Sequence, residues 1–394
     1  MGTAIEAATA LLTLAGIAYM LLALWGARDY VRAVQRARAG EAFAQGVSLL
    51  KPLKGIDPRM YAGLQSHCRQ AYPASVEIIF GVHRLDDPAV AEVRRLQLEF
   101  PGIPIELVEC RERLGTSGKV SNLVQMLPHA SFEYVVINDS DIFVAPTYLA
   151  GVMRYFGDPL VGMVTAPYIG RTGVGGRENT LWSKLEALGI STDFLPGVLT
   201  ARKLEGGIRF GMGSTLAFSR VALAKAGGLE PLAEFLADDY ELGKRISKAG
   251  YLVTLCGETV ETTVPAYGLR GFWDHQIRWA RSTRDSRKLG YIGLGVTYVI
   301  PWALMTVLAS GAALWSFTLL ALALLARIGV ALTIGVGLLR DGQVLRDLWL
   351  LPLRDVFGLI FWAWSFAGDT VVWRGEEFHL KDGKITRIER ARAQ

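Results

Sequence analysis

Two long apolar stretches at opposite ends of the chain constrain its fold more than any other feature. Ile5 to Ala27 holds 23 residues with a single charge, and Tyr291 to Leu339 holds 49 residues with Arg327 as the single charge. A helix of about 20 apolar residues crosses the ~30 Å hydrocarbon core of a bilayer. The first stretch therefore predicts one membrane anchor, and the second predicts two spans, with Pro301 kinking the first of them.

A third apolar segment, 348–373, is interrupted by Arg354, Asp355 and Asp369. Basic residues follow the first stretch, precede the second and recur near the C-terminus, and such clusters stay on the cytoplasmic side of a membrane. Four full spans would place the basic C-terminus outside. The charges therefore favour a re-entrant or surface-lying segment over a fourth span.

The expected organisation follows from these patterns. It comprises a transmembrane anchor (1–27), a basic amphipathic connecting helix (28–45), a cytoplasmic domain (46–288), two transmembrane helices (289–339), a loop with a re-entrant or transmembrane segment (340–373) and a basic cytoplasmic tail (374–394). This organisation predicts an integral protein of a bacterial-type inner membrane.

Composition limits the possible partners. The formal net charge is +5, but the arginines gather beside the apolar stretches, where anionic lipid headgroups attract them. No nucleic-acid-binding motif is present, so nucleic acid is not an expected partner. The three cysteines, Cys68, Cys110 and Cys256, are widely spaced, which argues against a disulfide framework and suits a reducing compartment.

The middle of the chain alternates strand and helix patterns. Strands are predicted at 47–53, 76–82, 103–108 and 134–137, helices at 61–70, 88–100, 120–127, 181–188, 221–226 and 239–249, and a loop at 170–176. This alternation predicts an α/β domain with a Rossmann-like, mostly parallel sheet. Ligands of such sheets bind beyond the carboxyl ends of the strands. Asp87 and the pair Asp139 and Asp141 stand at such ends.

Asp139 and Asp141 are candidate metal ligands. Mg²⁺ and Mn²⁺ prefer oxygen ligands, commonly one or two carboxylates together with substrate phosphates. Taken alone, Asp-Ser-Asp is more often a simple turn. The buried strand before it and the membrane anchor favour a diphosphate site. Lys119, at a predicted helix start, could contact a phosphate, with a solvated lysine as the equal alternative.

Asp238 and Asp239 form a second acidic pair at a predicted helix start. Carboxylates interact favourably with a helix N-terminus, so capping explains one of them. A transfer that inverts an anomeric carbon also needs a general base to remove the proton of the acceptor hydroxyl. One of the two carboxylates could serve as that base.

The run His275-Gln276-Ile277-Arg278-Trp279 lies on a helical segment that approaches the second apolar stretch. Arg278 can neutralise a diphosphate, and Trp279 can stack on a base or a sugar. Arginine and tryptophan are also common at membrane interfaces. These residues alone leave both interpretations open.

The order and spacing of several runs are more specific than any one of them. These runs are Val47–Gly55, Asp86-Asp87-Pro88-Ala89, Gly115-x-x-x-Lys-Val-Ser-Asn-Leu123, Asp139-Ser140-Asp141, Gly211–Ser214, Leu236–Tyr240 and Ile277-Arg278-Trp279. Together they resemble the ceramide glucosyltransferase family, a branch of the inverting GT-A glycosyltransferases, and its bacterial relatives that glycosylate hopanoids. The resemblance covers residues 47–288, with matching membrane segments outside.

The resemblance implies a role for each matching residue. Asp87 and Asp139 look like the aspartates that hold the nucleotide sugar, and Asp141 completes a metal pair with Asp139 for Mg²⁺ or Mn²⁺. Asp239 looks like the catalytic base, beside Asp238 in the donor site.

Arg278 and Trp279 look like the end of the family's Gln/Arg-x-x-Arg-Trp signature. The first position of that signature is His275 here, which leaves its contact open, with Gln276 as the alternative.

The implied activity is transfer of a hexose from a UDP-sugar to a membrane lipid. UDP-glucose and ceramide are the first expectation, and UDP-N-acetylglucosamine with a hopanoid polyol is the second, with diacylglycerol also possible. Two other functions remain as alternatives. A processive polysaccharide synthase usually needs more spans, and a non-enzymatic scaffold would not require these acidic residues and the arginine together.

Overall fold

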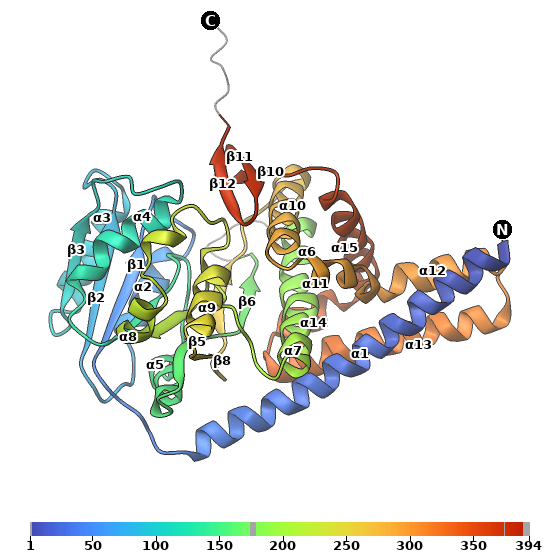
Figure 1. Ribbon diagram of the computed structural model, residues 1–394, viewed down its shortest axis with the longest axis horizontal. Coiled ribbons are helices and arrows are strands. Elements are labelled where there is room, and N and C mark those ends of the chain that lie inside the picture. Colours follow the sequence, from blue (N-terminus) through green and yellow to red (C-terminus); the bar gives the residue numbers. More distant parts are fainter. Residues whose placement is uncertain (1, 174–178, 374, 389–394) are drawn as a thin grey trace, which may run out of the picture.

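A seven-stranded sheet forms the centre of the α/β domain in the computed structural model, which describes residues 2–173, 179–373 and 375–388 (Figure 1). Its strands are β1 (Val47–Pro52), β2 (Val76–Val82), β3 (Ile105–Glu109), β4 (Tyr134–Ile137), β5 (Val161–Thr165), β7 (Leu216–Ser219) and β8 (Leu252–Leu255). They lie in the order β3-β2-β1-β4-β7-β5-β8. Only β7 runs antiparallel to its neighbours. The predicted α/β, mostly parallel, GT-A-like domain is confirmed.

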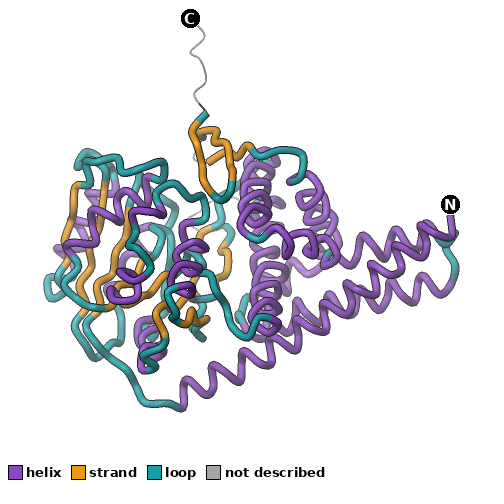
Figure 2. The backbone as a smooth tube through the Cα atoms, in the orientation of Figure 1, coloured by secondary structure: helices purple, strands orange, loops and turns teal. Residues whose placement is uncertain are grey.

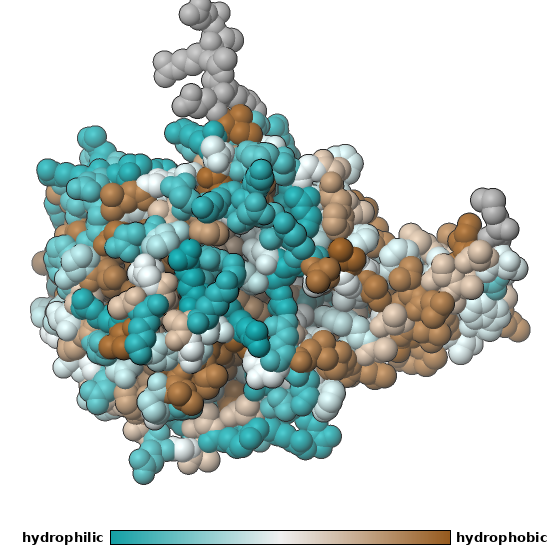
Figure 3. All heavy atoms as spheres, in the orientation of Figure 1, coloured by the Kyte–Doolittle hydropathy of each residue, from teal (hydrophilic) through white to brown (hydrophobic). Residues whose placement is uncertain are grey.

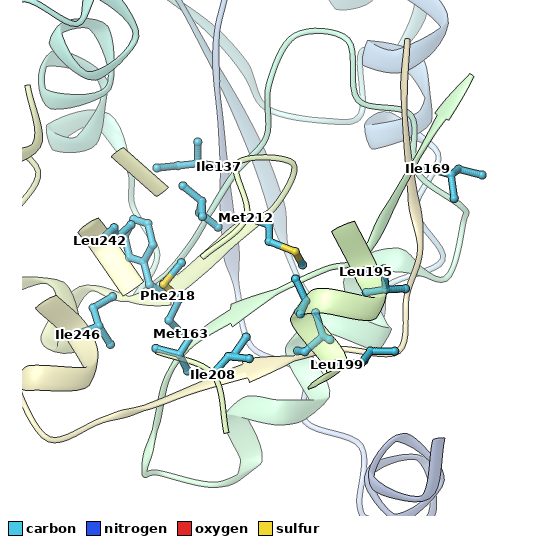
Figure 4. Close-up of a cluster of buried hydrophobic side chains, with 14 of the residues drawn as sticks. Ile137, Met163, Ile169, Leu195, Leu199, Ile208, Met212, Phe218, Leu242 and Ile246 are labelled. Atoms are coloured by element: carbon cyan, nitrogen blue, oxygen red, sulfur yellow. The ribbon is translucent and has the colours of Figure 1, made fainter. Parts of the chain in front are cut away.

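Both faces of this sheet are covered, so its strands are apolar on both sides. One face packs on α2 (Met60–Cys68), α3 (Ala89–Glu99) and α5 (Tyr148–Met153), and the other on α4 (Gly118–Met126), α8 (Arg220–Lys225) and α9 (Asp238–Lys248). Neighbouring residues alternate between the faces: Leu49 joins the first core and Leu50 the second. Figure 4 shows Phe218 of β7 beside Leu242 of α9 in the second core.

A smaller parallel sheet of β6 (Tyr168–Arg171) and β9 (Val260–Thr263) lies beyond the end of β4. The segment after β4 joins it through a bridge between Phe143 and Glu261. The predicted loop at 170–176 is therefore wrong in its first two residues, which belong to β6. Residues 174–176 of that prediction lie outside the described residues.

The N-terminal anchor continues without a break into the domain as α1 (Gly2–Ala39). At 38 residues it is about 57 Å long. Tyr30 donates a hydrogen bond to the Cys256 carbonyl, and Arg202 pairs with Asp29 at 2.7 Å. The separate linker helix predicted at 28–45 is thus part of the anchor helix, and it ends at Ala39 rather than at residue 45.

The C-terminal apolar stretch folds back along α1 (Figure 2). It contains α11 (Lys288–Leu294), α12 (Val299–Ala309) and α13 (Leu314–Val330), and α13 continues as a π-helix, η6 (Ala331–Leu338). The described residues hold two helices long and apolar enough to cross a membrane, Thr3–Ala39 and Leu314–Leu338. A third candidate is the pair Lys288–Thr297 and Val299–Ala309, which is bent by 56°. The bend lies at Tyr298, before α12 begins, so the kink predicted at Pro301 is wrong in position, and Pro301 itself lies in the first turn of α12.

Helices α6 (Leu181–Gly189), α7 (Leu195–Leu204), α10 (Leu269–Ser286), α14 (Gly342–Asp347) and α15 (Leu351–Ser365) lie between the α/β domain and the apolar helices (Figure 1). A π-helix, η3 (Ile190–Phe194), joins α6 to α7. With 15 residues, α15 is not among the candidate spans of the described residues.

The C-terminal segment differs from the tail predicted at 374–394. Its described residues form a three-stranded antiparallel sheet of β10 (Thr370–Trp373), β11 (Glu376–Lys381) and β12 (Lys384–Arg387). Val371, Phe378, Leu380 and Ile385 are buried in a core of their own. These alternating apolar residues bury one face of a sheet that was not predicted from the sequence.

Candidate active site

Lys119 connects two of the predicted site carboxylates at the carboxyl edge of the main sheet. It occupies the first turn of α4, which Ser117 caps by accepting a hydrogen bond from the Val120 amide. Its Nζ lies 2.8 Å from the Asp139 carboxylate and 3.4 Å from that of Asp238. Burial alone lowers the pKa of Lys119, but these two carboxylates raise it above its usual value. The solvated-lysine alternative is therefore wrong.

Asp239 faces Asp139 across Gly213. A Cβ atom added to Gly213 would lie 3.2 Å from Oδ2 of Asp239 and 3.6 Å from Oδ2 of Asp139. Two segments about a hundred residues apart thus place their carboxylates around one glycine. Burial and the neighbouring Asp238 raise the pKa of Asp239 to about 6. A carboxylate with that pKa is ionised at neutral pH and basic enough to accept a proton.

Asp141 turns toward the small sheet. Its Oδ2 accepts hydrogen bonds from Thr262 Oγ1 at 2.5 Å and from the Thr263 amide at 3.0 Å. Burial raises the pKa of Asp141, and the charge of Asp139 adds to this effect. β9 therefore fixes the second carboxylate of the Asp139-Ser140-Asp141 turn.

Asp139 and Asp141 offer oxygen ligands of the kind that a divalent cation prefers, and the charge of Asp139 acts on Asp141, so the two carboxylates are neighbours. Within the described ranges, no group of three or more His, Cys, Asp or Glu side chains is placed to hold a metal ion by itself. The contacts above engage Oδ1 of Asp139 and Oδ2 of Asp141. Two carboxylates completed by phosphate oxygens are a common arrangement for Mg²⁺.

Lys51 is a member of this region that the sequence did not single out. It is fully buried at the end of β1, and its Nζ donates a hydrogen bond to the Asp139 carbonyl at 3.0 Å. His67 Nε2 lies 3.4 Å away on the other side. Burial lowers the pKa of Lys51 to about 7, although Asp141 and Asp139 oppose the shift. The sequence did contain a signal for this residue, because a lysine stands near the end of an otherwise mostly apolar strand.

Asn138 holds the Asp139-Ser140-Asp141 turn in place. Its buried amide donates to the Ser214 carbonyl at 2.7 Å and to Tyr148 Oη at 2.9 Å. The bond to Ser214 ties the end of β4 to the residue after Gly213. This network explains how Asp139 and the glycine loop keep a fixed spacing.

His275 and Gln276 contact helices α6 and α15, and the His275 ring also stacks on that of Tyr267. His275 Nδ1 lies 2.9 Å from the buried carboxylate of Glu186, and its ring lies 4.7 Å from that of Trp279. Gln276 is buried and accepts a hydrogen bond from Arg354 at 2.8 Å. The structure thus gives both signature positions protein partners on α6 and α15.

Arg278 and Trp279 lie on the side of α10 that faces two tyrosines. Burial raises the pKa of Tyr168, as do the charges of Asp239, Glu186 and Asp139, while Arg278 lowers it. Burial likewise raises the pKa of Tyr267, on which Glu186, Arg278 and Asp141 also act. Trp279 and both tyrosines pack against the same small core of Ala187, Ile190 and Val264. The charge of Arg278 therefore reaches the groups that adjoin the carboxylates.

Asp87 stands at the same edge of the sheet but is engaged locally. Its carboxylate accepts hydrogen bonds from the Gly55 amide at 3.0 Å and the Ala89 amide at 2.9 Å. It therefore joins the loop after β1 to the start of α3. The described contacts place it beside Gly55 rather than beside Asp139, and its role toward a nucleotide stays a prediction.

Comparison with known proteins supports the resemblance. The family described as glycosyl transferase family 21 matches residues 8–386. Ceramide glucosyltransferase 1 of Caenorhabditis elegans is 26% identical over 239 residues, covering 60% of this chain and 49% of that protein. Ceramide glucosyltransferase of Candida albicans is 27% identical over 120 residues, covering 28% and 22%. The chain thus spans about half, or less, of the length of these relatives.

Among solved structures, a mannosyltransferase from Pyrobaculum calidifontis, in complex with GDP-Man and Mn²⁺, is similar at 20% identity and a TM-score of 0.48. The match covers 90% of this chain and 97% of that one. The family assignment rests on the sequence match, which extends over most of the chain. The chain belongs to glycosyl transferase family 21.

Proposed function

We propose that this protein transfers a hexose from a UDP-sugar to the hydroxyl group of a membrane lipid. The observation that carries the proposal is the meeting of Asp139 and Asp239 around Gly213, with Lys119 between Asp139 and Asp238. One carboxylate can help to hold the diphosphate of the donor, while another takes the proton from the hydroxyl group of the acceptor. Membership of the glycosyltransferase family supports this division of roles.

Asp239 is the general base of the proposed reaction. The acceptor oxygen attacks the anomeric carbon, its proton passes to the Asp239 carboxylate, and the bond from that carbon to the UDP oxygen breaks. Attack opposite the leaving group inverts the anomeric configuration. The raised pKa of Asp239 suits this transfer, because the group is ionised at pH 7 and still holds a proton well.

Asp139 and Asp141 would hold Mg²⁺ or Mn²⁺, which supplies positive charge to the leaving diphosphate. Lys119 adds a fixed positive charge beside Asp139, and Arg278 brings another from α10. Charge stabilisation of this kind acts strongly in a partly buried site. Asp87, Asp238 and Trp279 complete the proposed donor site.

The lipid acceptor reaches this site from the apolar helices. Figure 3 shows hydrophobic residues gathered over the arm that contains α1, α12 and α13. Large side chains there are strongly exposed, among them Leu11, Leu308 and Leu325. Such a surface suits lipid rather than water. The basic residues beside the apolar helices favour a cytoplasmic α/β domain on the inner membrane.

The test uses the full chain in lipid nanodiscs. UDP-glucose and UDP-N-acetylglucosamine are supplied with ceramide, a hopanoid polyol or diacylglycerol, and products are identified by mass spectrometry. We expect addition of a single hexose, with glucose and ceramide as the first expectation. Polymeric products would identify a processive synthase, and no transfer from any pair would refute the proposal.

Asp239→Asn is the decisive variant. It should retain UDP-sugar binding and lose at least about 100-fold in kcat, the lower range for general base catalysis. Asp86→Asn is the matched control, because Asp86 is exposed and pairs only with the neighbouring Arg84 among its described contacts. An active Asp239→Asn variant would show that Asp239 is not the base.

A further inference from the structure

The C-terminal sheet docks on the segment that leads into the acidic pair Asp238 and Asp239. Phe235 forms an antiparallel bridge with Lys384 of β12. The Leu236 amide donates to the Gly383 carbonyl at 3.0 Å, and the Ile385 amide donates to the Glu234 carbonyl at 2.8 Å. Residues 234–236 thus add a short strand to the edge of the C-terminal sheet.

Apolar burial reinforces this docking. Leu236 is 7% exposed and belongs to the small core formed by Val371, Phe378, Leu380 and Ile385. Among the described residues, it is the single buried member of that core from outside β10–β12. Two residues after Leu236, α9 begins with Asp238, so the position of the sheet is transmitted directly to the acidic pair.

The same segment is held from its other side by the loop that precedes Lys119. The Ser117 amide donates to the Ala233 carbonyl at 2.7 Å, and Thr116 Oγ1 donates to the Glu234 carboxylate at 2.6 Å. Residues 233–236 therefore lie between the Lys119 loop and β12. Movement of the sheet would change the alignment of Asp238 and Asp239 with Lys119.

Helix α10 fixes the sheet in turn. The Gly383 amide donates to the Asp285 carboxylate, and the Arg284 guanidinium donates to the Gly368 carbonyl at 3.0 Å. Asp382 and Gly383 have φ values of 50° and 81°, as a two-residue type I′ hairpin requires. The turn thus offers its amide to α10 and its carbonyl to Leu236. Figure 1 shows β10–β12 beside α10.

We propose that the C-terminal sheet is a positioning element of the active site, which sets Asp238 and Asp239 relative to α10 and Lys119. The expected effect on catalysis rests on the proposed function. The docking of the sheet on residues 234–236 rests on the contacts alone. Asp285 is the positioning residue, because its carboxylate binds the turn that also binds Leu236. Its removal frees the turn from α10 without touching Asp239.

Asp285→Ala in the full chain tests the proposal, with Lys288→Ala as the matched control. Lys288 contacts the same turn through an exposed ion pair with Asp382, a type of contact that contributes little. Hydrogen–deuterium exchange should quicken at Leu236 and Ile385 in Asp285→Ala and stay unchanged in Lys288→Ala. The kcat for hexose transfer should fall ~10- to 100-fold in Asp285→Ala, the size expected for a misplaced catalytic group, with little change in the KM for the donor.

A disulfide supplies the rescue. Phe235 and Lys384 form a non-hydrogen-bonded antiparallel pair, whose Cα atoms are about 4.5 Å apart, near the short end of the disulfide range. Adding Phe235→Cys and Lys384→Cys to Asp285→Ala should restore slow exchange and kcat when oxidised, and lose both when reduced.

Two results would overturn the proposal. Unchanged exchange at Leu236 in Asp285→Ala would show that the turn does not hold the segment, whatever the activity of the protein. Quickened exchange with unchanged kcat would show that the sheet does not position the acidic pair. A wild-type protein without transferase activity would instead refute the proposed function and, with it, the catalytic part of this inference, while the exchange measurement still decides the docking.

Discussion

Arg327 offers a test of how the membrane helices are joined to the α/β domain. It is 1% exposed within α13, and its guanidinium donates to Asp355 and to the Thr192 carbonyl, both at 2.8 Å. Arg327 also forms an ion pair with Asp193. Asp193 forms a second ion pair with Arg354, at 2.6 Å. Two positive and two negative charges thus form one largely buried, neutral cluster that links α13 and α15 to η3.

Charge balance determines the expected magnitudes. Arg327→Met leaves two carboxylates facing one arginine, and Asp355→Leu leaves two arginines facing one carboxylate. Breaking a buried pair from one side costs about 3–5 kcal/mol, whereas replacing both partners by apolar residues is often nearly neutral. The double variant keeps Asp193 with Arg354 and should therefore regain most of the stability that each single variant loses.

Thermal unfolding of the full chain in detergent micelles measures these effects. Both single variants should unfold at clearly lower temperature than the parent protein, and the double variant should unfold close to it. The coupling between the two sites is obtained from the double-mutant cycle. If the losses of the single variants simply add in the double variant, charge balance is not what stabilises this cluster.

Three further predictions concern the candidate site. Because the pKa of Asp239 is raised to about 6, kcat should fall tenfold per pH unit below pH 6 and level off above it; a profile flat down to pH 5 would contradict Asp239 as the base. Gly213→Ala should lower kcat at least several-fold with unchanged melting temperature, because the new Cβ lies 3.2 Å from Asp239; wild-type kcat would contradict the crowding. Removing divalent ions with EDTA should abolish transfer, and added Mg²⁺ or Mn²⁺ should restore it. Full activity in EDTA would show that Asp139 and Asp141 hold no metal that the reaction needs.

Local patterns predicted the elements that carry the acidic residues. β2 and β4 begin and end where their apolar runs do, and the helices after β1 and β2 shift by at most two residues at either end. The reason is physical. A buried parallel strand must be apolar on both faces, so its limits are visible in the residues themselves. The carboxylates that follow such strands were therefore predictable in place.

Strand partners depend on distant residues and were not predictable in the same way. β7 has four residues and enters the sheet antiparallel between β4 and β5. Nothing local in Leu216–Ser219 specifies those neighbours. Lys51 is comparable, because its partner is the Asp139 carbonyl in the turn that follows the adjacent strand β4. Both features depend on how the sheet is assembled.

The C-terminal sheet is a different case, since a local signal was present. Asp382-Gly383 is a strong type I′ hairpin dipeptide, and apolar and polar residues alternate on both sides of it. The positive charges of the segment led instead to the prediction of a basic cytoplasmic tail, with no strands assigned to it. Charge and strand pattern do not exclude each other here, because Lys381 and Lys384 are exposed while the alternating Phe378, Leu380 and Ile385 are buried.

Helix α10 gives the signature residues two separate tasks. His275 and Gln276 bind Glu186 and Arg354, and Arg354 belongs to the charge cluster of Arg327. Arg278 and Trp279 come one turn later and face the tyrosines beside the carboxylates. The helix therefore connects α6 and α15 to the candidate site. His275, at the first position of the signature, contacts both sets of partners, because its Nδ1 meets Glu186 while its ring lies 4.7 Å from that of Trp279 and stacks on Tyr267.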